Sequence, residues 1–231
     1  MRISIQQPEF FPWLGFFDKI RQVDKVVFLD NVQFKKRYFE NRNRVRTYDG
    51  WTWLITPIIT KGLYTQNINE VEIDNSRDWR KKLIGTIEHN YHKAPFWEEL
   101  GPELCQIVMN PMNRLVEFNL AVILLMLKKL GLSIDWVLSS SLNTQHHGSD
   151  LILEICEKIG AQEYLSGRDG KDYLNLDMFE EKGINVHFQN FVHPAYLQFH
   201  GGFEQAMSII DIYFNMGPKS IEVYKNKESD S

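Results

Sequence analysis

The sequence predicts an α/β fold, with a parallel or mixed sheet as its core, a β-hairpin and an inserted helical block. An apolar strand at 3–7, a helix-like segment and a β-branched run at 25–29 follow one another near the N-terminus. The same alternation of strand and helix returns after residue 133. Helical spacing of apolar residues between about 77 and 130 predicts the inserted block.

The chain has 231 residues, a net charge of −4 and two cysteines. This length fits a single α/β domain over 1–224, followed by a charged tail at 225–231 that we expect to fray. The negative charge argues against general binding of nucleic acids. Cys105 and Cys156 lie in apolar helical patterns, so we expect buried free thiols in a reducing compartment. The apolar runs are too short for a signal peptide or a membrane span, so we expect a cytoplasmic protein.

The first predicted ligand-binding loop follows the first strand. It begins with Gln6-Gln7-Pro8, whose amides lie at a strand end, where α/β proteins collect their ligands. A helix is expected from about Trp13 to Gln22, and Gly15 leaves room for a ligand beside its first turn. The aromatic side chains of the loop, which we expect to be exposed, could stack on a base or a sugar, with packing on the helix start as the alternative. These residues are Phe10, Phe11 and Trp13.

A second group of polar residues follows the second strand. Asp30 and Asn31 end that strand and should lie at the same edge of the sheet as Gln7. A basic run then extends from 35 to 46, with six Lys or Arg residues in twelve positions. Arginines at alternate positions of a strand project to one face and repel each other unless an anion lies among them. We therefore expect an anion-binding role, with a solvated charged face as the alternative, for Lys35, Asn41, Arg42 and Arg44.

Turn residues and periodicity predict the elements that follow. A turn at Tyr48–Trp51 joins two strands into a hairpin. Asn75-Ser76 is expected to cap the first helix of the block, and Ser149-Asp150 to cap a later helix that ends at Gly160. The third helix of the block is apolar on nearly every face and should be buried. The expected strands are 42–47, 52–59, 68–73, 133–138, 163–165 and 184–189. The expected helices are 78–91, one that begins at 94, 111–130, 151–159, 178–182 and 207–216.

Three further groups of residues could carry chemistry. The loop after the strand at 163–165 has two glycines flanked by cations and could hold a phosphate through Ser166, Gly167, Lys171 and Tyr173, although it lacks the Walker A spacing.

His146 follows three serines and is a candidate general base, alongside Gln7 and Asp30 as polar groups at the reacting centre. Asp211 shares a helix face with Asn215, and it is a base or an arginine partner if that face lines the crevice, or otherwise a cap or surface pair.

Several stretches together resemble the WbqC-like family of bacterial proteins. The resemblance covers Ile3 to about Gly217 and rests on IQQPEFFPWLGFFDKI, VDKVVFLDNVQF, NRNRV with WTWLITPI, YLSGRDGKDYL and SIIDIYFNMG. Members are typically encoded in surface-polysaccharide clusters, which implies a role in making or decorating a sugar. The opening also resembles class-I nucleotidyltransferases, but PWLG replaces their HxGH-type motif, and the missing histidines argue against adenylyl transfer.

Three functions remain open from the sequence. The first is a transferase of O-antigen biosynthesis that acylates or aminoacylates the amino group of a nucleotide-linked amino sugar. In that scheme Arg42, Arg44 and Lys35 hold the pyrophosphate and Trp13 or Phe10 stacks on the ligand. The second is an ATP-dependent adenylating ligase, and the third is a non-catalytic binding or assembly protein. We expect no metal site. The expected co-substrate is an acyl donor, an aminoacyl donor or ATP, and the expected small-molecule partner is a nucleotide sugar. A homodimer is one candidate assembly. Gln7, Asp30, Arg42 and Ser166 should surround one crevice.

Overall fold

The structure, a computed structural model, describes residues 1–224 and divides into two compact units. The first unit contains Met1–Gln7, Gly15–Val32 and Ile134–Val192, and the second contains Pro8–Leu14, Gln33–Ser133 and the chain from His193 onward. The sequence predicted a single domain over 1–224, whereas each unit is assembled from segments that are far apart in the chain. The tail at 225–231, which we expected to fray, lies outside the described residues.

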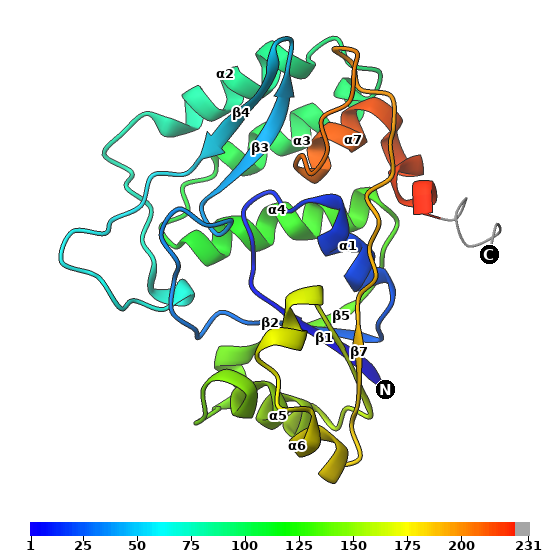
Figure 1. The fold of residues 1–231 in the computed structure, drawn as a ribbon. Helices are drawn as coiled ribbons and strands as arrows, with labels where there is room; N and C mark the ends of the chain where they lie inside the picture. Colours follow the sequence, from blue (N-terminus) through cyan, green and yellow to red (C-terminus); the bar gives the residue numbers. More distant parts are fainter. Residues whose placement is uncertain (225–231) are drawn as a thin grey trace. The chain divides into compact units, whose positions relative to one another are not determined.

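The first unit is built on a five-stranded parallel sheet in the order β5-β2-β1-β6-β7 (Figure 1). Counted in chain order, its strands are therefore arranged 3-2-1-4-5, which is the arrangement of doubly wound nucleotide-binding sheets. The prediction of an α/β fold with a parallel sheet core is confirmed. The strands are β1 (Arg2–Gln6), β2 (Lys25–Phe28), β5 (Asp135–Leu138), β6 (Glu163–Ser166) and β7 (Asn185–Phe188).

Helices cover both faces of this sheet. The face that carries Ile3, Ile5 and Val27 packs against α5 (Gly148–Ile159) and α6 (Leu176–Glu181) in one hydrophobic core. Side chains alternate along a strand, so Ser4 and Gln6 point to the opposite face. On that face, Phe16 of α1 (Leu14–Arg21) stacks on Phe28 of β2. Cys156 lies in the α5 core, where burial raises the pKa of its thiol to about 12, as expected for an inert buried cysteine.

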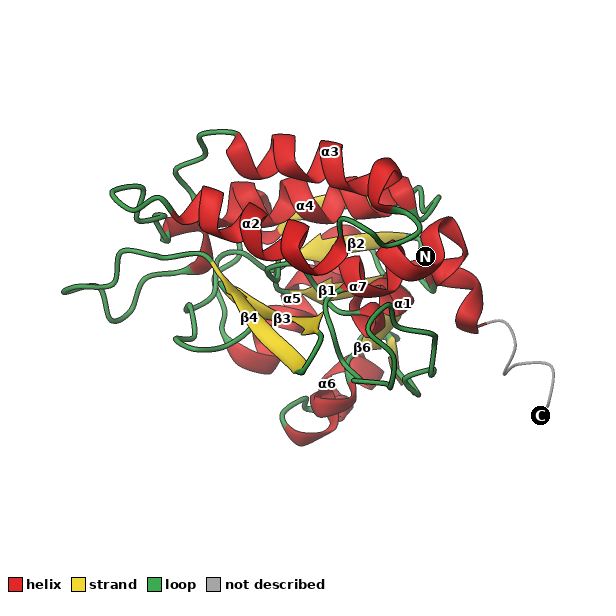
Figure 2. Ribbon diagram, turned by 90° about the horizontal axis from the view of Figure 1, so that it is seen from above, coloured by secondary structure: helices red, strands yellow, loops and turns green. Residues whose placement is uncertain are grey.

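The second unit combines the predicted hairpin with the predicted helices. Helix α2 packs beside α3, and α3 beside α4 (Figure 2). Helix α4 is buried at ten of its fifteen residues, which confirms the prediction of a central buried helix. Cys105 of α3 is only half-buried, so full burial was predicted wrongly for this thiol. The hairpin buries Val45 and Leu54 on one face, and the other, more open face carries the exposed Trp51 and Ile55 beside the buried Arg46. The elements are β3 (Arg42–Thr47), β4 (Gly50–Ile55), α2 (Trp79–Tyr91), α3 (Trp97–Met109), α4 (Leu115–Lys129) and α7 (Ile209–Met216). Among residues 1–224, no helix has both the length and the apolar composition of a membrane span.

One predicted strand is wrong. The stretch expected as a strand at 68–73 is a 3-10 turn, Ile68–Glu70, followed by isolated bridges. The carboxylate of Glu70 accepts a hydrogen bond from the backbone N–H of Asn67 at 2.7 Å, which closes the turn locally. Side chains that bond nearby backbone groups compete with strand pairing, and here the turn forms instead. The other 3-10 segments are Ser139–Leu142, Arg168–Asp172 and Gly217–Tyr224.

Two predicted helix caps are also wrong. Helix α2 starts after Asp78, and the side-chain carbonyl of Asn75 instead accepts hydrogen bonds from the side chains of Trp79 and Arg80. Helix α5 starts after His147, so the predicted caps lie inside its first turn. There the hydroxyl of Ser149 accepts a hydrogen bond from the backbone N–H of Asn175 at 3.0 Å. In both cases the side chain that the local pattern predicted as a cap forms hydrogen bonds with other partners.

Candidate functional site

The carboxyl ends of the five parallel strands form one edge of the first unit. The register pairs Gln6 with Phe28 and Phe28 with Leu138, so Gln7, Asp30 and Ser139 follow their strands at this edge. Ser166 pairs with Phe188 on the other side of β1. Connections run from β1 toward β2 and β5, and then return past β1 to β6. The switch point therefore lies between β1 and β6, where doubly wound folds bind their ligands.

Gln6 stands at this switch point with an unusual environment. It is 8% exposed, yet neither its amide oxygen nor its amide nitrogen has a hydrogen-bond partner among the described residues. The hydroxyl of Ser4, two residues earlier on the same face, is also buried without a partner. Burying an amide without hydrogen bonds is unfavourable unless a ligand or water completes them. The sequence pattern placed both amides at the strand end but selected Gln7, which is half-buried, as the site residue. Strand alternation with Ser4 was the signal that could have identified Gln6.

The glycine loop follows β6 directly. Ser166 is fully buried, and the chain then turns into the 3-10 segment, with the N–H of Gly170 donating to the carbonyl of Gly167. Lys171 and Tyr173 are exposed, and the Lys171 ammonium lies 5.3 Å from the centre of the Phe188 ring at the end of β7. The loop therefore brings a buried hydroxyl and the exposed ammonium of Lys171 to the edge that also carries Gln7.

Asp30 organises the loop that follows β5. Its carboxylate is 1% exposed and accepts hydrogen bonds from the Ser139 hydroxyl at 3.0 Å, the Ser140 N–H at 2.9 Å and the Ser140 hydroxyl at 2.7 Å. Next to it, the amide of Asn31 donates to the hydroxyl of Thr144 at 2.9 Å. Asp30 thus reaches the predicted edge, but its contacts favour the role of a positioning residue over the expected role at the reacting centre.

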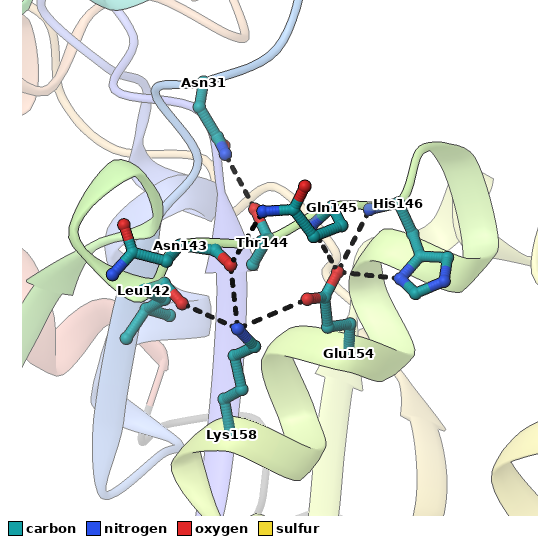
Figure 3. Close-up of polar contacts among 8 residues, drawn as sticks. All are labelled: Asn31, Leu142, Asn143, Thr144, Gln145, His146, Glu154 and Lys158. Carbon is teal, nitrogen blue, oxygen red and sulfur yellow. Dashed lines mark hydrogen bonds and ion pairs between the residues drawn. The ribbon is translucent and has the colours of Figure 1, made fainter.

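His146 is held beside helix α5 by Glu154 (Figure 3). The Glu154 carboxylate accepts the backbone N–H groups of Gln145 and His146 and lies 2.9 Å from His146 Nδ1. Lys158 donates to two carbonyls of the same loop and pairs with Glu154 at 3.3 Å. Desolvation acts against ionisation, but these hydrogen bonds outweigh it and lower the pKa of Glu154 to about 2. The exposed His146 ring is oriented by its contact with Glu154 and not by the serines that precede it in the chain.

The N-terminal loop lies mainly in the second unit, and its aromatics are not all exposed. Phe10 and Phe11 are fully buried, with ring centres 4.6 Å apart, so the expected exposure is wrong for both. Asn43 donates to the carbonyl of Phe11 at 2.8 Å, which ties the loop to the hairpin. Packing and backbone bonds thus place these rings in the core. Trp13 stays half-buried and stacks on His193, with planes 15° apart.

Two other predicted site residues have structural partners. Gly15 is buried in the first unit, and its carbonyl accepts a hydrogen bond from the Gln189 amide at 2.8 Å. Asn41 donates to the carbonyl of Thr56 at 3.0 Å and so fixes the start of the hairpin.

Asp211 is an internal residue and not a surface residue, and the positive charge of Arg46 acts on its carboxylate. It is fully buried and accepts hydrogen bonds from Tyr91 at 2.6 Å, Tyr196 at 2.5 Å and Gln198 at 3.0 Å. Burial raises the pKa of Asp211 despite these bonds. The helix face it shares with Asn215 is internal, so the carboxylate ties α7 to α2 and to the loop at 193–207. The periodicity of α7 predicted the shared face but not its partners.

Glu40 is a buried carboxyl that the sequence pattern did not single out. It is fully buried, and neither of its oxygens has a hydrogen-bond partner that meets normal geometry among residues 1–224. Burial raises the pKa of Glu40 to about 7, against the opposing effect of the Lys35 ammonium. Its position between Phe39 and a hairpin strand was the only local signal. A carboxyl that changes protonation near neutral pH is a candidate for function as well as for pH-dependent stability.

The arginine row lies on the open face of the hairpin. The register confirms that Arg42, Arg44 and Arg46 share that face. Arg42 stacks on Trp53 with its guanidinium carbon 4.3 Å from the ring centre, and Arg44 on Trp51 at 5.1 Å. Arg46 is buried and donates to backbone carbonyls. Aromatic rings and backbone carbonyls therefore stabilise the three neighbouring charges. The alternating pattern had predicted that an anion would do so.

The four residues expected around one crevice are divided between the units. Gln7, Asp30 and Ser166 follow strands at the same edge of the first-unit sheet. Arg42 and the other anion-binding candidates of the basic run belong to the second unit.

Comparison with known proteins gives two matches. The model of the WbqC-like protein family matches residues 7–223. The uncharacterized protein Rv1507c of Mycobacterium tuberculosis (strain ATCC 25618 / H37Rv) is 31% identical over 221 residues, which cover 95% of this chain and 95% of that protein. No solved structure matches the chain.

Proposed function

The chain belongs to the WbqC-like protein family, and from this premise we propose that it is a biosynthetic enzyme of bacterial surface polysaccharides. Its reaction is the acylation or aminoacylation of the amino group of a nucleotide-linked amino sugar. The family resemblance supports the polysaccharide setting. The 3-2-1-4-5 parallel sheet supports the nucleotide part, because this arrangement places a ligand-binding switch point between β1 and β6.

The observation that carries the proposal is the group of polar side chains at that switch point. The amide of Gln6 is buried without partners among the described residues, and Ser166 is buried on the neighbouring strand. Gln7 and Gly167 follow these residues at the carboxyl edge. In this proposal Ser166, Gly167 and Lys171 contact the phosphates of the nucleotide sugar through a hydroxyl, a backbone N–H and an ammonium. The arginines expected from the sequence to hold the pyrophosphate lie in the second unit, and the assignment of the nucleotide does not depend on them.

Amide formation requires a free amine and a stabilised oxyanion. The amine of the sugar attacks the carbonyl carbon of an acyl or aminoacyl ester or thioester, and the negative charge that develops on the carbonyl oxygen needs hydrogen-bond donors. As the intermediate collapses, the bond from that carbon to the leaving oxygen or sulfur breaks, and the proton taken from the amine passes to the leaving group. The amide N–H groups of Gln6 and Gln7 are the proposed donors at the strand end. His146 is the proposed base: with Nδ1 engaged by Glu154, Nε2 is the nitrogen left to accept the proton of the attacking amine.

Calorimetric titration with UDP-, dTDP- and GDP-linked amino sugars tests the nucleotide site. We expect one class of nucleotide sugar to bind, and Ser166→Val and Lys171→Gln to weaken binding by about tenfold or more, because each removes a polar contact to the phosphates. Ser141→Ala, at an exposed serine of the neighbouring loop, is the matched control and should bind as the unaltered chain does. Binding that is absent for the whole panel, or equal in all variants, contradicts the proposal.

An adenylating ligase is the second candidate, because the same switch point suits ATP and the glycine loop carries exposed Arg168 and Lys171. Mass spectrometry separates the two candidates. A transferase gives an N-acylated nucleotide sugar with no pyrophosphate, whereas a ligase releases pyrophosphate from ATP. Binding of a sugar without either product supports the third function, a non-catalytic binding or assembly protein.

A further inference from the structure

The hairpin and the loops on either side of it are rich in positive charge. Residues 35–64 carry seven basic and two acidic side chains, in a chain whose net charge is −4. Cations in this segment lie on aromatic rings: Arg42 on Trp53, Arg44 on Trp51, and Lys36 on Tyr64 at 4.8 Å. We call these six residues, four from the hairpin and two from the flanking loops, the basic-aromatic face. All of them belong to the second unit.

The guanidinium groups of this face are oriented but not neutralised. One terminal nitrogen, Nη2, of Arg42 donates to the carbonyl of Arg37, and Nη2 of Arg44 donates to the carbonyl of Ala206. No carboxylate of the described chain forms an ion pair with Arg42, Arg44 or Lys36. Each arginine is thus held by one carbonyl and one indole ring, with positive charge left for an external anion.

The aromatic side chains are accessible as well. Trp51 is 42% exposed and Tyr64 is 75% exposed, although burial in the core is the usual place for large aromatic rings. An apolar ring beside an unpaired cation suits a ligand that has both a flat or weakly polar face and an anionic group. Sugar rings with carboxylate substituents have this combination: their C–H faces pack on indole and their carboxylates accept hydrogen bonds from guanidinium.

Single-stranded nucleic acid is the competing ligand class, and the geometry disfavours it. Bases stack in succession on aromatic platforms. The rings of Trp51 and Trp53 are 83° apart, so they cannot continue one stack. We propose that the basic-aromatic face binds an acidic saccharide chain, distinct from the nucleotide sugar assigned to the first unit.

The test uses the full chain without any nucleotide sugar, so its outcome does not depend on the proposed transferase activity. The probe is a hexamer of galacturonic acid, measured by calorimetry at low and high salt, with a galactose hexamer as the neutral match. We expect the acidic hexamer to bind and its affinity to fall with salt. Arg42→Gln with Arg44→Gln should weaken binding by about tenfold or more, since two charge-assisted hydrogen bonds are lost. Trp51→Ala should weaken it by roughly threefold to tenfold through the lost ring contact.

Matched controls keep the interpretation specific. Lys82→Gln with Lys93→Gln removes the same charge from exposed positions outside this face and should leave binding unchanged. Circular dichroism and the melting temperature show whether each variant is folded, and Arg42→Lys, which keeps the charge but loses the planar fork, should fall between the parent and the double variant. Binding that is absent, insensitive to the arginine and tryptophan changes, or stronger for the neutral hexamer overturns the inference. Tighter binding of a thymidine dodecamer or of inorganic pyrophosphate assigns the face to nucleic acid or to a diphosphate instead, and overturns it too.

Discussion

A Cβ atom at Gly170 would lie 2.0 Å from the hydroxyl oxygen of Ser166. No side chain fits in this gap, so the absence of one at Gly170 lets the 3-10 turn close on the end of β6. The serine that we assign to phosphate contact therefore keeps its position because of a glycine four residues later in the chain.

Gly170→Ala should displace the Ser166 side chain or the turn. We expect a loss of about 1–3 kcal/mol in the free energy of unfolding, measured by urea denaturation, because the inserted methyl overpacks a closed site. Gly85→Ala on helix α2 is the control: a Cβ there would have no neighbouring atom within 4 Å, and alanine should stabilise the helix by about 1 kcal/mol. If both variants are equally stable, Ser166 is not constrained as described.

Asp30→Ala should destabilise the first unit. Its carboxylate accepts three hydrogen bonds from Ser139 and Ser140 in a site that is 1% exposed. Losing them removes charge-assisted bonds that hold the turn after β5, so the free energy of unfolding should fall by about 2 kcal/mol or more. Asp172→Ala, at an exposed position, should change it by less than about 0.5 kcal/mol. A similar small effect for Asp30→Ala would show that the serine loop does not need this carboxylate.

Glu40 should make stability depend on pH near neutrality. Burial raises its pKa from 4.5 to about 7, so the folded state binds the proton more tightly than the unfolded state. The stabilisation is complete below pH 4.5 and is lost as the pH rises through 7, by on the order of 2 kcal/mol. In Glu40→Gln that decline should disappear when unfolding is measured from about pH 4.5 to 8. Glu98→Gln, at an exposed position, should retain the parent profile.

Glu154 should have the opposite pH dependence. Its pKa in the folded state is lowered to about 2, so its contribution is present above the unfolded value of 4.5 and is lost as the pH falls through 2. Hydrogen-exchange protection of the Gln145 and His146 amides should fall across that range, and in Glu154→Gln it should already be low at about pH 6. Glu157→Gln, on the same helix and paired with Lys182, serves as the control. Unchanged protection in Glu154→Gln would mean that other contacts hold the loop.

Local structure follows closely from the sequence, since it depends on neighbouring residues. The β-branched run at 25–29 became β2, Arg42–Thr47 became β3 without a shift, and Gly160 ends α5 with a left-handed backbone. Errors arose where a distant or side-chain partner competed with the local pattern. Glu70 closed a turn where a strand was expected, and Asn175 took the hydroxyl of Ser149.

The candidate site could be predicted only in part. Strand ends identify Gln7, Asp30 and Ser166 because polar residues there stand out against apolar strands. Exposure is a different matter: Phe10 and Asp211 are fully buried, and no residue next to them in the chain indicates this. For Glu40 and for the unpartnered amide of Gln6 the sequence offers only weak local signals, the neighbouring Phe39 and the alternation with Ser4.

The sequence by itself determined the type and order of most elements, the polar residues at their ends and the family of the chain. These properties follow from the short-range periodicity of apolar residues and from the motif residues. The tertiary structure decided the 3-2-1-4-5 strand order, the division into two units and the contacts of each charged group. The physical reason is that burial and pairing depend on segments more than a hundred residues apart, such as Asp30 with Ser139 and Tyr91 with Asp211, and such partners are chosen by packing of the whole chain.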